Sequence, residues 1–137
     1  MKTLSVADRR RLLDAAAVVS KNAYAPYSHF QVGAALLAVD GRIYTGANVE
    51  NVSFGATLCA ERAALSAAVT EGARQFSALA ICAGDCPTSP CGLCRQMLAE
   101  FGDLVVLYAD SALTTVRETT LSALLPEAFT DFKADRS

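Results

Sequence analysis

Two short cysteine motifs constrain the fold of this chain more than any other feature of its sequence. Cys59-Ala60-Glu61-Arg62 and Pro90-Cys91-Gly92-Leu93-Cys94 each lie at the start of a predicted helix. The two cysteines of the second motif can point at one centre, and the partial positive charge of a helix N-terminus favours their thiolates. By itself, this pair fits either a metal site or a thioredoxin-like redox pair. A fold that uses both motifs together has to bring two helix N-termini side by side.

The remaining sequence predicts strands and helices that alternate after an opening hairpin. We expect helices over residues 5–22, 58–71, 91–101 and 119–125, and strands over residues 32–39, 42–49, 78–83, 104–109 and 114–117. Asp40-Gly41 is typical of a two-residue hairpin turn, while Gly72 and Gly102 are typical helix ends. Such alternation favours a mixed sheet with helices on both faces, in the α/β class.

Composition limits the classes of protein to which the chain can belong. Its 137 residues suit one domain, residues 1–137, and the hydrophobic fraction of 53% against 19% charged residues excludes a disordered chain. The net charge of −2 lacks the basic excess that nucleic-acid binding needs. The longest strand-like apolar run, residues 32–39, is far short of the roughly 20 residues of a membrane span. Charged residues near the N-terminus argue against a signal peptide, so we expect a cytoplasmic protein.

A third thiolate from Cys59 would leave a tetrahedral zinc ion one ligand short, which is typical of a catalytic site. Glu61 then lies where a carboxylate that is not a ligand can move a proton of the acidified water. Both motifs together match the zinc deaminase signature, a His or Cys, then x-Glu, then Pro-Cys-x-x-Cys. Two alternatives stay open: Glu61 is only a first-turn glutamate favoured by the helix dipole, or the site is a closed structural one with His29 or Cys86 as fourth ligand.

Over nearly its whole length the chain resembles the cytidine deaminase family, in its short, three-cysteine form. Beside the two cysteine motifs, the resemblance rests on Ala25-Pro26-Tyr27-Ser28-His29-Phe30, Val32-Gly33-Ala34-Ala35, Gly46-Ala47-Asn48-Val49-Glu50-Asn51, Ser89, Arg95-Gln96 and Leu124-Leu125-Pro126-Glu127-Ala128-Phe129. The resemblance implies a three-layer α/β/α sandwich around a five-stranded mixed sheet, one zinc ion per chain, and a homotetramer with sites at subunit boundaries. It also implies hydrolysis of the nucleosides cytidine and deoxycytidine to uridine and deoxyuridine, with release of ammonia, in pyrimidine salvage.

The same resemblance assigns roles to individual residues. It implies Cys59, Cys91 and Cys94 as zinc ligands and Glu61 as the proton shuttle, passing a proton from zinc-bound water to ring N3 before hydroxide attacks C4. The implied substrate contacts are the Phe30 ring on the pyrimidine, Asn48 and Glu50 on the ribose hydroxyls, the Ala60 N–H on the base carbonyl, the Ser89 carbonyl on the departing amino group, and Phe129 in a neighbouring subunit's site.

Charge adds two expectations. Three thiolates leave a zinc site anionic, so we expect Arg62 to donate hydrogen bonds to ligand sulfurs, since no carboxylate lies three or four residues away to pair with it. The Glu50 carboxylate would repel a phosphate, which favours free nucleosides, and it argues against the related blasticidin-type deaminases.

Four further residues carry lesser expectations. We expect His29 to be a structural hydrogen-bonding residue and Tyr27 to lie at a subunit boundary. Cys86 is a poorer ligand candidate than Cys59 because it does not open a helix. The small Ala56, between the ribose motif and the zinc helix, predicts tolerance of N4-substituted cytidines.

Overall fold

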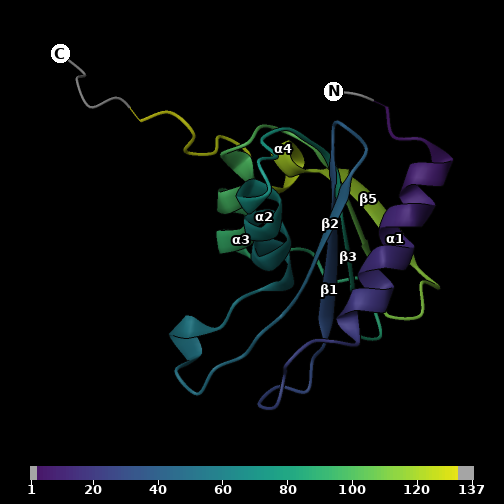
Figure 1. The fold of residues 1–137 in the computed structure, drawn as a ribbon, viewed down its shortest axis with the longest axis vertical. Helices are drawn as coiled ribbons and strands as arrows, with labels where there is room; N and C mark the ends of the chain where they lie inside the picture. Colours follow the sequence, from purple (N-terminus) through teal and green to yellow (C-terminus); the bar gives the residue numbers. More distant parts are fainter. Residues whose placement is uncertain (1–2, 133–137) are drawn as a thin grey trace.

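The computed structural model describes residues 3–132, which form one mixed sheet covered by helices (Figure 1). Its helices are α1 (Val6–Ser20), α2 (Ala60–Thr70), α3 (Gly92–Ala99) and α4 (Leu121–Leu124), with a short 3₁₀-helix η1 (Phe54–Ala56) before α2. Its strands are β1 (Val32–Ala38), β2 (Ile43–Ala47), β3 (Phe76–Ala83), β4 (Val105–Ala109) and β5 (Val116–Thr120). None of these helices has the length and apolar content needed to cross a membrane.

The five strands lie in the order β2-β1-β3-β4-β5. Only β3 and β4 pair in parallel; the other three pairs are antiparallel. Helix α3 makes the crossover between the parallel strands, as such a connection requires. The expected five-stranded mixed sheet is therefore confirmed.

Alternate residues of the central strands face two separate cores. In β1, Ala34 and Leu36 belong to the core with α2, α3 and α4, whereas Ala35 and Leu37 belong to the core with α1. Side chains of a strand alternate between the two faces of a sheet, so an almost wholly buried strand needs a helical layer on each side. Figure 1 shows α1 on one side of the sheet and α2 and α3 on the other, which confirms the three-layer α/β/α sandwich.

The hairpin between β1 and β2 differs from its prediction. Its loop has three residues, 39–41, closed by hydrogen bonds from the Ala38 N–H to the Arg42 carbonyl and from the Gly41 N–H to the Ala38 carbonyl. A two-residue turn of the expected type needs positive φ at both central residues. Only Gly41 has it, with φ 95°, so the Asp-Gly pair occupies the end of a longer loop.

The C-terminal elements also differ from their predictions. Strand β5 is Val116–Thr120 and not residues 114–117, and the helix expected over residues 119–125 is only α4. Thr114 and Thr115 belong to the preceding turn because the Asp110 carboxylate accepts hydrogen bonds from the Thr114 hydroxyl and the Thr115 N–H. Strand β5 therefore begins only after these residues, at Val116.

Glycine at position 46 sets how closely α2 approaches the sheet. A Cβ atom there would lie 2.4 Å from the Ala64 nitrogen and 2.6 Å from the Ala60 carbonyl oxygen. Only a residue without a side chain permits this contact between β2 and the first turns of α2. The N-terminus of α2, which carries the first cysteine motif, is thereby fixed against the sheet.

Candidate active site and metal centre

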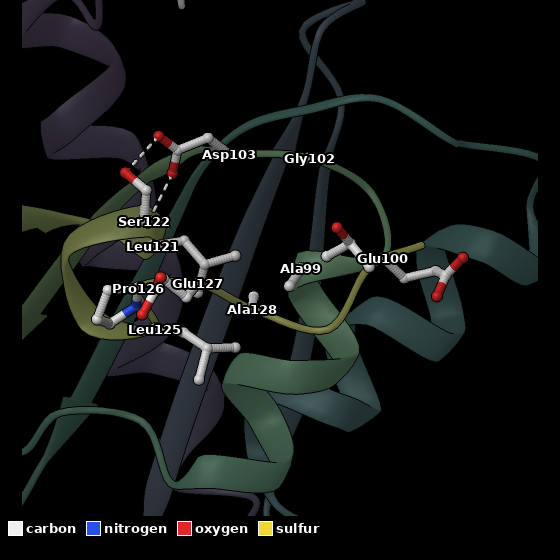
Figure 2. Close-up of a pocket in the computed structure, with 11 residues that line it drawn as sticks. Ala99, Glu100, Gly102, Asp103, Leu121, Ser122, Leu125, Pro126, Glu127 and Ala128 are labelled. Atoms are coloured by element: carbon white, nitrogen blue, oxygen red, sulfur yellow. Dashed lines mark hydrogen bonds between the residues drawn. The ribbon is translucent and has the colours of Figure 1, made fainter. Parts of the chain in front are cut away.

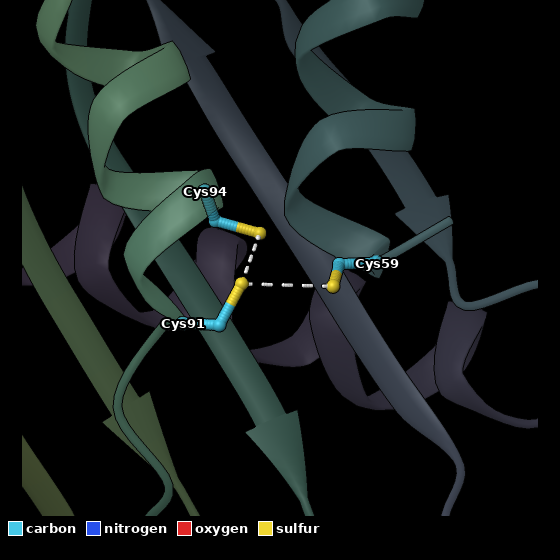
Figure 3. A group of neighbouring side chains, drawn as sticks. All are labelled: Cys59, Cys91 and Cys94. Atoms are coloured by element: carbon cyan, nitrogen blue, oxygen red, sulfur yellow. Dashed lines mark hydrogen bonds between the residues drawn. The ribbon is translucent and has the colours of Figure 1, made fainter. Parts of the chain in front are cut away.

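The sulfur atoms of the three motif cysteines meet between α2 and α3. Cys59 and Cys91 are the N-cap residues of these helices, and Cys94 lies in the first turn of α3, so all three side chains point into one space (Figure 3). The Cys59 and Cys91 sulfurs are 3.8 Å apart, those of Cys91 and Cys94 are 3.3 Å apart, and all three lie within 4.8 Å of one another. The expected meeting of the two helix N-termini is confirmed.

Zinc fits these three sulfurs. Zn–S bonds of about 2.3 Å in a tetrahedral centre separate the sulfurs by about 3.8 Å, the distance between Cys59 and Cys91. Burial raises the pKa of Cys91, but hydrogen bonds with Cys94, Cys59 and the Leu93 backbone together bring it below its usual value. Burial, and then the charge of Glu61, raise the pKa of Cys94. A soft divalent cation with high affinity for thiolates suits this donor set.

The two other candidate ligands lie apart from this group. Across residues 3–132, the three cysteines form the only cluster of potential ligands close enough to hold one ion, and neither His29 nor Cys86 is in it. Cys86 is exposed in the loop before α3. Within residues 3–132 no hydrogen bond involves the His29 imidazole, and the structural hydrogen-bonding role expected for His29 stays a prediction. Its backbone, at φ 60°, is part of a turn.

Arg62 lies beside the sulfur of Cys59. Its Nη2 atom donates to Cys59 Sγ at 3.5 Å and to the Thr57 carbonyl at 3.3 Å, as the sequence predicts for an arginine that serves an anionic site. The hydrogen bond to Cys59 raises the pKa of Arg62 against the effect of burial. A permanent positive charge at this point compensates part of the negative charge of three thiolates.

Glu61 is a buried carboxyl group next to the sulfurs. Only 5% of the residue is exposed, and burial raises its pKa, with hydrogen bonds and the charge of Arg62 acting in the opposite direction. A carboxyl group with a raised pKa can both take up and release a proton nearer neutral pH. Glu61 therefore has the environment of a general acid and base, and not that of an exposed first-turn glutamate.

One cavity of about 280 Å³ joins the sulfur cluster to most of the other predicted residues. Residues from both motifs and from the loops around them line it: Phe30, Asn48, Glu50, Cys59, Ala60, Glu61, Ser89 and Cys91. The sequence places these residues in four separate segments, which meet at one end of β1 and β3. With about 280 Å³, this partly polar cavity lies near the lower end of the sizes typical of small-molecule pockets.

Asn48 and Glu50 lie just beyond β2, and both side chains have protein partners. Asn48 Oδ1 accepts from the Val32 N–H at 2.8 Å, and its Nδ2 donates to the Phe30 carbonyl at 2.9 Å. The Glu50 carboxylate accepts from the Tyr27 and Ser28 N–H groups and from the Ser28 hydroxyl. The hydrogen bond from Ser28 is the main cause that lowers the pKa of Glu50.

Phe30 enters the cavity from the loop before β1. Its ring packs against Gly84, where a Cβ atom would lie only 2.7 Å from Phe30 Cε1. Gly84 also has a φ of 63°, in the left-handed region that favours glycine. Position 84 thus leaves room for the ring at the cavity wall.

Two backbone groups that the sequence singles out lie at the start of α2 and in the loop just before α3. The Ala60 N–H is the first of α2, where N–H groups have no partner within the helix. Across the described residues no hydrogen bond uses the Ser89 carbonyl, so that oxygen is available to a ligand. Arg95 fixes the loop that contains Ser89. Its Nε donates to the Pro90 carbonyl at 2.7 Å, its Nη2 donates to Ser89 Oγ, and its Nη1 donates to the Leu124 carbonyl.

Phe129 and Ala56 lie outside the lining of this cavity. Phe129 is 65% exposed in the segment after α4, where its carbonyl accepts from Gln96 Nε2 at 2.8 Å. Ala56 is exposed in η1, so its size does not shape the cavity of one chain. The structural reason given for tolerance of N4-substituted substrates is therefore wrong within a single chain.

Sequence reasoning missed the contacts that Ser28 and Arg95 make. Both residues lie inside motifs on which the resemblance rests, but their partners are far along the chain: Ser28 contacts Glu50, and Arg95 contacts Leu124. The Ser-x-Phe spacing, which is typical of a turn closed by a serine hydroxyl, is the one local signal that points to Ser28.

A second cavity, of about 450 Å³, lies between the end of α3, α4 and the segment after α4 (Figure 2). Its acidic residues are Glu100, Asp103 and Glu127, and Asp103 already accepts hydrogen bonds from the N–H and hydroxyl groups of Ser122. None of the residues that line it belongs to a cysteine motif. The smaller cavity at the sulfur cluster is therefore the candidate active site.

A three-layer α/β/α fold that places a buried glutamate beside three converging cysteines defines a zinc-dependent deaminase. Comparison with known proteins agrees: residues 6–109 match the family described as "Cytidine and deoxycytidylate deaminase zinc-binding region". Since this match spans most of the chain, the chain belongs to that family.

Individual relatives are similar over almost their whole length. A cytidine deaminase of Sporosarcina psychrophila is 48% identical over 125 residues, which cover 89% of this chain and 91% of the relative. One from Halalkalibacterium halodurans is 48% identical over 126 residues, covering 90% and 95%. Among solved structures, the crystal structure of cytidine deaminase from Burkholderia pseudomallei superposes with a TM-score of 0.83 at 44% identity, covering 88% of this chain and 98% of that one.

Proposed function

We propose that this protein hydrolyses cytidine and deoxycytidine to uridine and deoxyuridine and releases ammonia. The observation that carries the proposal is the buried Glu61 carboxyl group beside three cysteine sulfurs at the wall of one small cavity. The relatives that bear the name cytidine deaminase support the choice of substrate. We further propose a place in pyrimidine salvage in the cytoplasm, which is where free nucleosides are recovered.

Cys59, Cys91 and Cys94 would hold zinc, which when bound supplies a Lewis acid that makes water a better nucleophile at neutral pH. Glu61 takes a proton from water and delivers it to ring N3, so that C4 becomes electrophilic. The water oxygen bonds to C4, and Glu61 passes the second proton to the amino group. The C4–N bond then breaks, ammonia leaves, and the C4 carbonyl of the uracil ring remains.

The other cavity residues bind and orient the nucleoside in this proposal. Phe30 stacks on the pyrimidine, the Ala60 N–H donates to the base carbonyl, and the free Ser89 carbonyl accepts from the amino group as it departs. Glu50 accepts a hydrogen bond from a ribose hydroxyl. The side-chain amide of Asn48 has two N–H donors, of which the Phe30 carbonyl uses one, so the other can donate to the sugar. The carboxylate of Glu50 would repel a nucleotide phosphate.

We also propose that the protein is a homotetramer with active sites at subunit boundaries. Exposed apolar side chains lie around the cavity mouth, where Tyr27 packs edge to face on Phe54 with ring centroids 5.8 Å apart. Tyr27 and Phe54 are 48% and 73% exposed in one chain, and Phe129 is exposed as well. Burial of such side chains in another subunit would favour assembly, and it would allow Phe129 to reach a neighbouring site.

The direct test is the ultraviolet absorbance of cytidine mixed with the zinc-loaded protein. We expect the spectrum to change to that of uridine, with one ammonia released for each cytidine consumed. A folded protein with one zinc per chain that leaves cytidine unchanged would overturn the proposed substrate.

A structural zinc module is the alternative, and it needs a fourth protein ligand. Cys86→Ala and His29→Ala should both keep zinc, because neither side chain lies within the sulfur cluster. Loss of zinc from either variant, measured by elemental analysis after dialysis, would favour the structural role.

A further inference from the structure

We propose that Ser28 is a positioning residue for the reaction: its hydroxyl orients the Glu50 carboxylate toward the substrate ribose and links it to the loop that carries Phe30. The inference rests on the ribose role of Glu50 proposed above. It assigns to Ser28 a part in sugar recognition.

Three hydrogen bonds hold the Glu50 carboxylate before any substrate enters. Oε1 accepts from the Tyr27 N–H at 3.0 Å and from the Ser28 N–H at 3.1 Å, and Oε2 accepts from the Ser28 hydroxyl. The hydroxyl is the only one of these donors that reaches Oε2. Without it, only Oε1 of the carboxylate is held, and Oε2 has no protein donor to fix its direction.

The Ser28 hydroxyl has one proton, and its surroundings decide where that proton points. The Phe30 N–H donates to Ser28 Oγ at 3.0 Å, and an N–H group can only donate. Ser28 must therefore give its own proton to Glu50. One hydroxyl thus joins the backbone of the proposed stacking residue to the proposed sugar-binding carboxylate, through the tight turn at His29, where φ is 60°.

The number of acceptor sites shows what remains for the substrate. An ionised carboxylate offers about four lone-pair sites, and the three protein donors leave about one of them free. Ser28 is also the main cause of the lowered pKa of Glu50, which keeps the group an acceptor. The Glu50 carboxylate, whose orientation Ser28 fixes, can accordingly accept a hydrogen bond from one ribose hydroxyl.

The loop does not depend on this hydroxyl for its fold. Backbone hydrogen bonds join it to the segment beyond β2, from the Tyr24 N–H to the Asn48 carbonyl at 2.9 Å and from the Glu50 N–H to the Tyr24 carbonyl at 2.8 Å. Ser28 is exposed, so a methyl group added there has space. Both Ser28→Ala and Ser28→Thr should fold.

The test measures kcat/KM for cytidine and for 2′,3′-dideoxycytidine, which lacks the 2′ and 3′ hydroxyls of the ribose but keeps the 5′ hydroxyl. The variants are Ser28→Ala, Ser28→Thr, Glu50→Ala and the double variant Ser28→Ala/Glu50→Ala. For cytidine we expect kcat/KM to fall about tenfold in Ser28→Ala and further in Glu50→Ala. Ser28→Thr keeps a hydroxyl and should retain the kcat/KM of the unchanged protein. For dideoxycytidine we expect each change to have little effect. In the Glu50→Ala background, Ser28→Ala should cost nothing further.

Ser53→Ala is the matched control, since Ser53 lies in a neighbouring loop and its side chain makes no cap hydrogen bond. Equal losses on both substrates in Ser28→Ala, or additive losses in the double variant, would overturn the inference while leaving Glu50 in its role. A Glu50→Ala variant that loses equally on both substrates would overturn the ribose role itself, and the role of Ser28 with it.

Discussion

The Arg62 guanidinium donates to the sulfur of Cys59 at 3.5 Å, three residues before it at the start of the same helix. Its Nε atom is buried without a hydrogen-bond partner, the one such side-chain atom within residues 3–132. A buried donor without a partner costs about 1–3 kcal/mol. Arg62 thus lies beside the Cys59 sulfur although this arrangement leaves one of its donors unpaired.

Replacement of Arg62 tests this relationship. Arg62→Gln removes the positive charge next to Cys59, and we expect zinc affinity to fall about 10- to 100-fold. Competition with a chromogenic chelator measures the affinity. Arg10→Gln, at an exposed arginine of α1, is the control and should bind zinc as the unchanged protein does. Equal affinities in the two variants would show that Arg62 does not serve the metal site.

Glu61→Gln tests the proton shuttle. The amide has nearly the same shape but cannot carry the proton, so we expect kcat to fall about 10²- to 10⁴-fold. Zinc content and the circular dichroism spectrum should stay unchanged. Glu100→Gln, at the exposed end of α3, should keep full activity. A Glu61→Gln variant that turns over substrate nearly as fast as the unchanged protein would remove Glu61 from the mechanism.

Gly46→Ala tests the close approach of α2 to the sheet. The added methyl group would lie 2.4 Å from the Ala64 nitrogen, so the helix has to shift. We expect a loss of about 1–3 kcal/mol in the free energy of unfolding, or more, measured by urea denaturation. Gly55→Ala is the matched control because nothing lies within 4 Å of the Cβ atom that it adds. Similar stabilities of the two variants would contradict the packing argument.

Asp110 should make part of the stability dependent on pH. Hydrogen bonds from the Thr114 hydroxyl and the Thr115 N–H hold the pKa of Asp110 below its usual value. The ionised group thus favours the folded state above the unfolded-state pKa of about 3.9, and this contribution is lost as pH falls through the lower, folded-state pKa.

The measurement for Asp110 compares urea midpoints at neutral and acidic pH. Asp110→Asn should be less stable than the unchanged protein at pH 7, and its stability should fall less between pH 7 and pH 3. Asp14→Asn, at an exposed residue of α1, should follow the unchanged protein. A fall of the same size in Asp110→Asn would show that Asp110 does not contribute to the pH dependence.

The features that the sequence predicts correctly are those that depend on residues close together in the chain. Cys91 and Cys94 lie one helical turn apart, so their meeting follows from helix geometry, and Cys59 could be added because a known signature joins the two motifs. The alternation of buried residues in β1 likewise follows from the period of a strand. These features account for the three layers, the mixed sheet and the sulfur cluster.

Other features depend on contacts that no local pattern contains. Ser28 and Glu50 are 22 residues apart, and Arg95 and Leu124 are 29 apart, so their hydrogen bonds follow only from the folded chain. The Asp40-Gly41 pair suits both a two-residue and a three-residue hairpin loop, and φ at Asp40 decides between them. Which of the four cavity-lining segments face one another is likewise set by the sheet order.

The sulfurs of Cys59 and Cys91 come from positions 32 residues apart, at the starts of two helices that a whole strand separates in the chain. An ion held between them would act as a staple, closing a loop that includes α2 and β3. A disulfide around a loop of that length restricts the unfolded chain by roughly 3–4 kcal/mol. The same three thiolates would then contribute both to catalysis and to thermal stability. Removal of the ion would therefore lower the melting temperature of the enzyme as well as abolish its activity.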